Sequence, residues 1–189
     1  MSQTRPVRPP RPPRTVAGMV GALIVVVALG VLWVEVGGSD EKPTEVASAD
    51  WQAWAKAGRA DGKLTVLAPA QLPNGWRATS AAYESGSAPL WRMGMLTGAK
   101  KFVGLAESAA STDDLVQEYV DENAERGGDV TVAGETWQSW TDSGGDYAVV
   151  RTLATPSGGQ ERVLVYGSAP DGAIRDFAAS LSAQVVPTG

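Results

Sequence analysis

Residues 16–34 read Val16-Ala-Gly-Met-Val-Gly-Ala-Leu-Ile-Val-Val-Val-Ala-Leu-Gly-Val-Leu-Trp-Val34, nineteen residues without a charged side chain. A helix rises about 1.5 Å per residue, so a helix of this length covers roughly the 30 Å hydrocarbon layer of a bilayer. Trp33 lies where an interfacial aromatic residue is expected, and Glu35 is the first charge beyond it. The stretch therefore predicts a transmembrane helix that anchors the chain from Val16 to Val34.

The charges on the two sides of this stretch differ in sign. Residues 1–14 carry four of the 16 basic residues and no acid, whereas the rest of the chain holds 12 basic and all 21 acidic residues, so the net charge of −5 divides into +4 and −9. Arginines before a first span favour a cytoplasmic amino terminus. We therefore predict a single-pass protein of the cell membrane with an extracytoplasmic domain in the cell envelope. An acidic domain also disfavours nucleic acid as a partner.

The amino-terminal tail, residues 1–15, is rich in arginine and proline and is expected to be disordered. In a polyproline II helix, with three residues per turn, its arginines would line one edge and contact anionic lipid headgroups or serve a cytoplasmic partner. Topology alone also explains their charge, and we prefer that simpler interpretation. The four arginines are Arg5, Arg8, Arg11 and Arg14.

Two further features concern the anchor itself. Gly18 and Ala22 form a small-xxx-small pair, a weak signal for a homodimer formed through the helix. A cleaved signal peptide is the alternative to an anchor, because Val46-Ala-Ser-Ala49 resembles a cleavage site. The apolar run is longer than the apolar core of a typical signal peptide, which has about 7–15 residues, so we expect no cleavage. Residues 35–43 are predicted to be a flexible linker.

Residues 44–189 are predicted to form one extracytoplasmic α+β domain. We expect helices from Thr44 to about Gly58 and from Ser111 to Gly127, and a last one that starts at Ser168-Ala-Pro-Asp171. Because the connections between strands are short and rich in glycine, the strands must pair as antiparallel hairpins. The expected order is α-β4-α-β4-α, an antiparallel sheet with packed helices. The predicted strands are Leu64–Ala68, Trp76–Tyr83, Leu90–Leu96, Lys101–Glu107, Val130–Val132, Thr136–Thr141, Tyr147–Leu153 and Arg162–Gly167.

The helices have recognisable caps and buried faces. Ser111-Thr-Asp-Asp114 is a capping-box variant, and Gly127 is expected to end the helix that follows it. In the first helix we expect Trp51 and Trp54 to pack onto the domain rather than rest on the membrane. The residues expected to be buried in the two later helices are Leu115, Val116, Tyr119, Val120, Ile174, Phe177, Ala178 and Leu181.

The chemistry of the chain is limited by what it lacks. It has no cysteine and no histidine, which excludes disulfides, histidine-based or cysteine-based nucleophilic catalysis and the usual zinc sites. Asp142 and Asp146 flank a turn as a weak calcium possibility, and a solvated acidic surface is the preferred interpretation. Lys100 or Lys101 with Ser108 would make a catalytic Ser/Lys pair, but their spacing is generic and lysines at a turn are ordinary. We predict no catalytic residue, no metal, no cofactor and no enzymatic activity.

The chain is unusually rich in tryptophan, with seven tryptophans among 189 residues. Tryptophan anchors many recognition sites, but it is also an ordinary core residue. We expect Trp76 and Trp91 in the core. Trp137 and Trp140 lie three apart on one strand and must face opposite sides of the sheet, so one of them is a candidate contact for an envelope protein or a glycan.

Five sequence segments together resemble a known family. They are Leu64-Thr-Val-Leu-Ala-Pro-Ala-Gln-Leu-Pro-Asn-Gly-Trp-Arg-Ala-Thr-Ser80, Trp91-Arg-Met-Gly-Met-Leu-Thr97, Val132-Ala-Gly-Glu-Thr-Trp137, Val150-Arg-Thr152 and Val165-Tyr-Gly-Ser-Ala169. In this order the chain resembles the domain-of-unknown-function family 4245, a group of actinobacterial single-pass membrane proteins. The resemblance implies an anchored extracytoplasmic domain and supplies no site residues. Our hypothesis is a binding or interaction module of the cell envelope; the alternative is a ligand carrier or hydrolase with a cleft of carboxylates and tryptophans.

Overall fold

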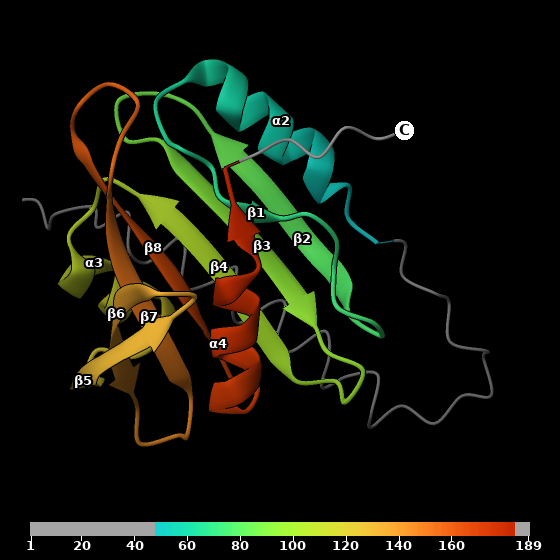
Figure 1. Cartoon of the computed structure of the whole chain (residues 1–189), viewed down its shortest axis with the longest axis vertical. Coiled ribbons are helices and arrows are strands. Elements are labelled where there is room, and N and C mark those ends of the chain that lie inside the picture. Colours follow the sequence, from blue (N-terminus) through green and yellow to red (C-terminus); the bar gives the residue numbers. More distant parts are fainter. Residues whose placement is uncertain (1–47, 184–189) are drawn as a thin grey trace, which may run out of the picture. The chain divides into compact units, whose positions relative to one another are not determined.

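The structure is a computed structural model that describes residues 48–183 (Figure 1). The chain divides between Glu45 and Val46, and the described residues belong to the second of the two units. The predicted tail, transmembrane helix and linker, and the expected helix start at Thr44, lie outside the described residues. Within residues 48–183, no helix is long and apolar enough to span a bilayer.

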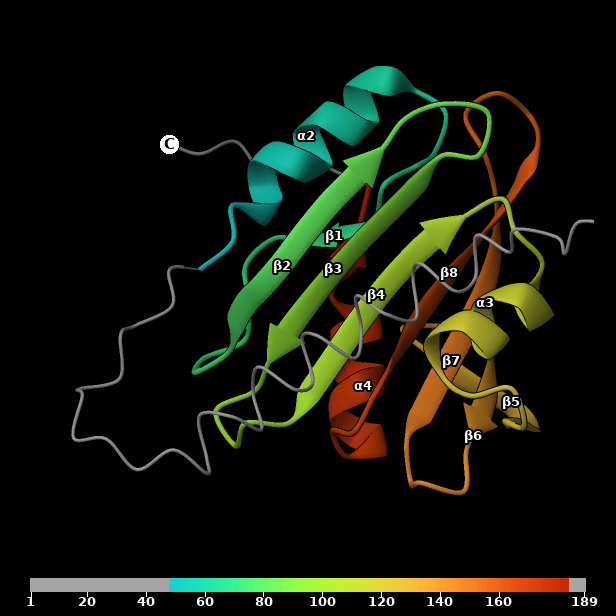
Figure 2. The same cartoon turned by 180° about the vertical axis from the view of Figure 1, so that it is seen from behind.

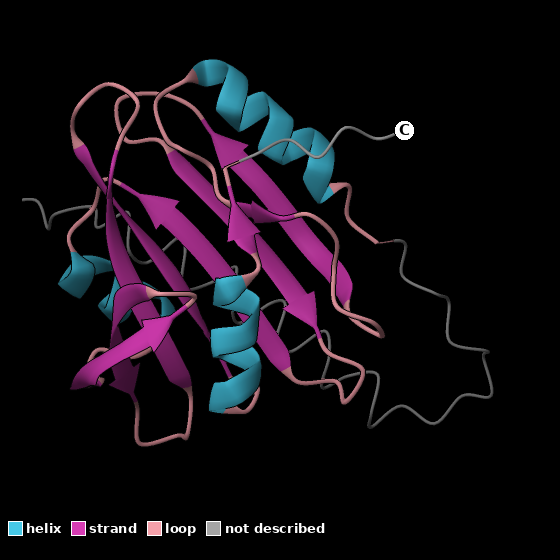
Figure 3. Cartoon of the chain, viewed as in Figure 1, coloured by secondary structure: helices cyan, strands magenta, loops and turns pink. Residues whose placement is uncertain are grey.

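The described region contains three helices and nine strands, and antiparallel sheet dominates, as predicted (Figure 3). The helices are α2 (Trp51–Asp61), α3 (Thr112–Tyr119) and α4 (Asp171–Ala179). The order is the predicted α-β4-α-β4-α with one short strand added at the end. The strands are β1 (Ala68–Pro69), β2 (Arg77–Glu84), β3 (Leu90–Leu96), β4 (Phe102–Ser108), β5 (Glu125–Val132), β6 (Glu135–Thr141), β7 (Tyr147–Ala154), β8 (Gln160–Gly167) and β9 (Leu181–Ser182).

Seven strands form one sheet in the order β2-β3-β4-β8-β7-β6-β5, and every neighbouring pair is antiparallel. The two hairpin blocks meet where β4 pairs with β8, with Glu107 opposite Val163. Strands β1 and β9 form a separate two-stranded sheet. The last strand thus returns to the beginning of the domain, which closes the fold.

Both faces of the large sheet carry buried side chains, because neighbouring residues of a strand point to opposite sides. On β8, Val163 and Val165 belong to the larger core, together with residues of α2 and α4, whereas Leu164 belongs to a smaller core with α3. Figures 1 and 2 show α4 and α3 on opposite sides of the sheet.

Helix α3 begins as predicted and ends earlier than predicted. Ser111 caps it through a reciprocal capping box with Asp114, but the helix stops at Tyr119. Gly127 lies instead in β5, where a Cβ atom would come within 2.4 Å of Ser139 Oγ on the neighbouring strand. The glycine therefore allows close approach of two strands and does not end a helix. The prediction was wrong because both roles require the same residue type.

Helix α2 also differs from its predicted bounds. It begins at Trp51, where the carboxylate of Asp50 accepts a hydrogen bond from the backbone N–H of Ala53 at 3.0 Å. Gly58 lies inside the helix against Tyr83 rather than at its end. Of the predicted strand 64–68, only Ala68 pairs, within β1.

The two tryptophans of α2 have different environments. Trp51 is buried in the larger core, as predicted. Trp54 is 45% exposed, and it is the one large apolar side chain in residues 48–183 that is exposed to this degree. The expectation that both tryptophans pack onto the domain was therefore wrong for Trp54, which lies three residues along the helix from Trp51 and away from the core.

Candidate functional site

Trp137 and Trp140 point to opposite faces of the sheet. Trp137 is buried in the larger core, with 3% of its surface exposed. Trp140 is half-buried against the smaller core, and its indole N–H donates a hydrogen bond to Gln138 Oε1 at 3.2 Å. Of the two, only Trp140 presents surface to a partner. The other sequence-predicted contacts, namely Arg5, Arg8, Arg11, Arg14, Val16, Gly18, Ala22, Trp33 and Val34, lie outside the described residues.

The other two sheet-region tryptophans serve the core. Trp91 is fully buried, and its indole N–H donates to the carbonyl oxygen of Leu67 at 2.8 Å. Trp76 is half-buried and stacks on Phe177 of α4, with the ring centroids 5.7 Å apart. The core prediction thus holds fully for Trp91 and in part for Trp76.

The chemically most unusual feature is a pair of buried carboxylates on neighbouring strands. Glu107 of β4 and Glu161 of β8 are both 0% exposed. The two carboxyl oxygens of Glu107 accept hydrogen bonds from the backbone N–H groups of Val66 and Leu67, the latter at 2.7 Å. Both oxygens of Glu161 lie 3.1–3.2 Å from the backbone nitrogen of Thr65. Three consecutive amides of one segment are therefore held by the two carboxylates.

This segment has a strained backbone that the carboxylates fix. Val66 has φ +56°, a left-handed conformation that is unfavourable for a β-branched residue and costs on the order of 1–3 kcal/mol. Arg59 of α2 holds the same segment from the other side, because its Nε donates to the carbonyl oxygen of Val66 at 3.0 Å. The same guanidinium donates to the carbonyl oxygen of Ser182 at 3.2 Å. We call residues 64–67 the latched segment, and its contacts explain why the predicted strand does not form.

Burial dominates the electrostatics of this cluster. It raises the pKa of Glu107 to about 8, and the charge of Glu161 acts in the same direction, while the backbone hydrogen bonds and Arg59 oppose the shift. Burial also lowers the pKa of Arg59, against the effect of Glu107. Raised carboxyl pKa values are common in active sites, where the group meets substrate. Here the oxygen atoms contact the chain's own amides, so the cluster is built to hold structure.

The sequence does contain a signal for this pair. Along β4, Val103, Leu105 and Glu107 alternate on one side, and along β8 Glu161 precedes Val163 and Val165 with the same period of two. When a carboxyl group continues a series of inward-facing apolar residues, either the strand has been assigned wrongly or the group is buried with specific hydrogen-bond partners. Sequence reasoning missed the pair because nothing local shows which backbone amides would reach it.

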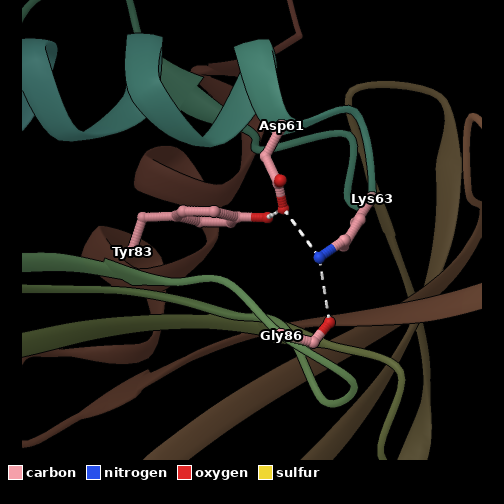
Figure 4. A network of polar contacts seen from close by, with 4 residues as sticks. All are labelled: Asp61, Lys63, Tyr83 and Gly86. Carbon is pink, nitrogen blue, oxygen red and sulfur yellow. Dashed lines mark hydrogen bonds and ion pairs between the residues drawn. The ribbon is translucent and has the colours of Figure 1, made fainter.

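A second polar network ties α2 to the sheet (Figure 4). Asp61, the last residue of α2, accepts a hydrogen bond from the hydroxyl of Tyr83 at 2.7 Å and forms an ion pair with Lys63 at 3.5 Å. Lys63 also donates to the carbonyl oxygen of Gly86 at 3.1 Å. Burial and then the bond to Asp61 raise the pKa of the Tyr83 hydroxyl above its usual range. The network fixes the carboxyl end of α2 to the β2–β3 hairpin.

Two open hollows lie elsewhere on the described surface. One, of about 390 Å³, has mainly apolar walls between the β2–β3 loop and α3, and includes Glu118 and Tyr119. The other, of about 510 Å³, is polar and lies on β5, β6 and β7, where Arg151 and Glu135 form an ion pair at 3.0 Å. Neither is lined by a tryptophan, so neither is the carboxylate and tryptophan cleft of the alternative hypothesis.

The remaining sequence candidates do not form a reactive centre. Asp142 caps its own turn, since Oδ1 accepts from the backbone N–H of Asp146 at 2.7 Å. Within residues 48–183, no three acidic side chains gather in a way that would hold a metal ion. Ser108 is the last residue of β4, whereas Lys101 precedes its first residue, Phe102. Ser108 Oγ accepts a hydrogen bond from the backbone N–H of Ala110 at 3.1 Å.

Fold and site together define an antiparallel α+β domain with a filled core, whose buried acids serve its own backbone. The chain belongs to the family described as "Protein of unknown function (DUF4245)", whose model matches residues 11–181. The resemblance inferred from the sequence is thereby confirmed. No curated protein matches the chain.

Two solved structures are similar over part of the chain. One belongs to the Pseudomonas aeruginosa MucA/MucB complex, with 16% identity and a TM-score of 0.37 over 61% of this chain and 34% of that one. The chain thus spans about a third of that protein's length. The other is a protein from Rhodobacter sphaeroides, with 20% identity and a TM-score of 0.19 over 72% of this chain and 76% of that one.

Proposed function

We propose that this protein is a membrane-anchored, extracytoplasmic binding or interaction module of the cell envelope, and not an enzyme. The anchor is the uncharged stretch Val16–Val34, and the arginines before it and the acids after it orient the chain with the domain outside. The domain is too acidic for a nucleic acid partner, so an envelope protein or a glycan is the class of partner that we propose.

The proposal that this is not an enzyme is supported by the burial and the hydrogen-bond partners of Glu107 and Glu161. General acid–base catalysis needs a carboxyl group within hydrogen-bond reach of a substrate. Glu107 and Glu161 are fully buried, and their oxygens accept hydrogen bonds from three backbone amides. The two fully buried acids of the described region are thus engaged by the domain's own backbone, which favours a module that acts through its surface.

The anchoring part of the proposal is testable with single cysteines, because the natural chain has none. In intact cells, a Ser157→Cys variant should react with a membrane-impermeant thiol reagent, since Ser157 is exposed in the β7–β8 turn. A Ser2→Cys variant should stay unlabelled until the membrane is permeabilised. The reverse pattern would show the opposite orientation.

Processing is tested on the same cells. The full-length chain should stay in the membrane fraction after a wash with high salt and alkaline carbonate. A soluble product that begins at Asp50 would show that residues 1–49 are a signal peptide, and the anchored module would then be rejected.

A further inference from the structure

The outward face of α2 has an unusual composition for a helix on a protein surface. Such a face is normally charged or polar. Here Ala53, Trp54, Ala57 and Ala60 are all exposed, and their spacing places them on one side of the helix. Trp51, Ala55 and Gly58 form the side that packs on the sheet. Trp54 lies at the border of the exposed face nearest to that side, and the three alanines point farther away from it. We call the four exposed residues the outer face of α2.

Trp54 is the energetically important member of the outer face. A tryptophan buries more apolar area than any other side chain, and its N–H prefers a wet, polar neighbour. A site that is apolar on one side and wet on the other is the lipid–water interface, where tryptophan is enriched. An exposed tryptophan among three alanines matches such a layer better than it matches bulk water.

The position of α2 in the chain indicates which surface this helix meets. Sixteen residues, 35–50, separate the end of the apolar stretch at Val34 from the start of α2. Even a fully extended chain of sixteen residues spans at most about 53–58 Å. If Val34 lies at the membrane surface, α2 is held close to that surface at a high effective concentration.

The charges around the outer face are compatible with contact. Asp61, at the end of the helix, is engaged by Tyr83 and Lys63 (Figure 4). Lys56 is exposed beside the outer face and carries the charge that anionic headgroups attract. The polar network at Asp61 also fixes the helix to the sheet, so contact through α2 would orient the whole domain.

We propose that the outer face of α2, with Trp54 as its main apolar contact, rests on the lipid–water interface of the membrane that anchors this chain. The inference rests on the proposed anchoring by residues 16–34. It gives the domain a fixed side toward the bilayer, and leaves the β6–β7 turn, at the other end of the domain from α2 in Figure 1, directed away from it.

The test uses the full chain reconstituted into phosphatidylethanolamine and phosphatidylglycerol vesicles that contain spin-labelled lipid. An environment-sensitive fluorophore is attached at Ala57→Cys on the outer face or, as the distant control, at Ser143→Cys in the β6–β7 turn. We expect strong quenching at position 57 and little at position 143. Adding Trp54→Ser to the position-57 reporter should remove most of the quenching, whereas Gln52→Ser, at another exposed position of α2, should leave it unchanged.

Each other result has a definite meaning. If the chain floats with the vesicles but positions 57 and 143 are quenched equally weakly, the anchoring stands and the membrane contact of α2 is rejected. The contact is also rejected if Trp54→Ser leaves the quenching intact, or if position 57 is shielded by protein, as shown by energy transfer between labelled copies that vanishes on dilution into excess lipid. If the chain does not float, the proposed anchoring fails first. Near-UV circular dichroism of each variant verifies the fold.

Discussion

The stability of the domain should fall as pH rises from about 5 to about 8, because of Glu107. Its pKa is raised by burial to about 8 in the folded state, from 4.5 for an unburied glutamate. Between these values the folded state binds a proton that the unfolded state has released. The contribution of Glu107 to the free energy of unfolding therefore decreases with rising pH in this window and is greatest below pH 4.5.

The size of the effect follows from the shift and the contacts. Each pKa unit corresponds to about 1.4 kcal/mol, so the full shift amounts to at most about 5 kcal/mol. That is a large part of the roughly 5–15 kcal/mol by which ordinary domains are stable. Replacing Glu107 by Gln removes the titration. It also leaves the amide of Val66 or Leu67 facing an NH₂ group, and one unsatisfied buried amide costs about 1–3 kcal/mol.

Urea denaturation of residues 46–189, followed by tryptophan fluorescence at pH 5, 6, 7 and 8, measures this directly. We expect Glu107→Gln to be less stable than the natural sequence at pH 5, and the difference to shrink or reverse by pH 8. Glu118→Gln, on the exposed side of α3, is the matched control and should leave the pH dependence unchanged.

Two outcomes would refute this reasoning. In the first, the free energy of unfolding of the domain with its natural sequence stays constant or rises between pH 5 and 8, and the Glu118→Gln control behaves in the same way. The other is a Glu107→Gln variant that keeps the full pH dependence of the natural domain. Either would mean that Glu107 is ionised in the folded state across this range, held by the amides of Val66 and Leu67 and by Arg59.

Two further predictions concern local structure. Leu115→Ala should lower the free energy of unfolding by about 2–5 kcal/mol, because Leu115 is 1% exposed. Loss of the helix cap in Ser111→Ala should cost about 1 kcal/mol, and Glu118→Ala should cost almost nothing. Urea midpoints rank the three variants, and a larger effect for Glu118→Ala than for Leu115→Ala would contradict the packing of α3. Ala133→Gly should stabilise the domain by several tenths to about 1 kcal/mol, because exposed Ala133 has φ +50° in the tight β5–β6 turn before Gly134. The thermal midpoint of unfolding measures this, and a lower midpoint for the variant would show that the alanine side chain has a contact of its own.

Much of the fold could be predicted because its signals are local. The capping box at Ser111, the glycine-containing turns and the period-two alternation each depend on residues within a few positions of one another. From these the order of helices and strands and the antiparallel class follow, and β3 was predicted to the residue as Leu90–Leu96. Where other strand ends differ from the prediction, they do so by one to five residues, most at the start of β5, because hydrogen bonding to the neighbouring strand decides where a strand ends.

The errors fall where a residue type has more than one physical use. A glycine ends helices, but at Gly127 it admits the side chain of Ser139 from the next strand. Two tryptophans one helical turn apart suggest a single buried stripe, but only Trp51 reaches the core, and Trp54 remains 45% exposed. Neither alternative can be chosen without knowing which strand or face lies opposite.

By itself the sequence determined the local elements of the domain and its family, and it predicts an uncharged anchor with opposite charges on its two sides. Only the tertiary structure decided that β4 pairs with β8, which brings Glu107 and Glu161 together beneath the latched segment. The physical reason is distance along the chain. The hydrogen bond from Leu67 to Glu107 joins residues 40 apart, and the one from Thr65 to Glu161 joins residues 96 apart. The energies of such bonds depend on burial and on partners that no local pattern contains.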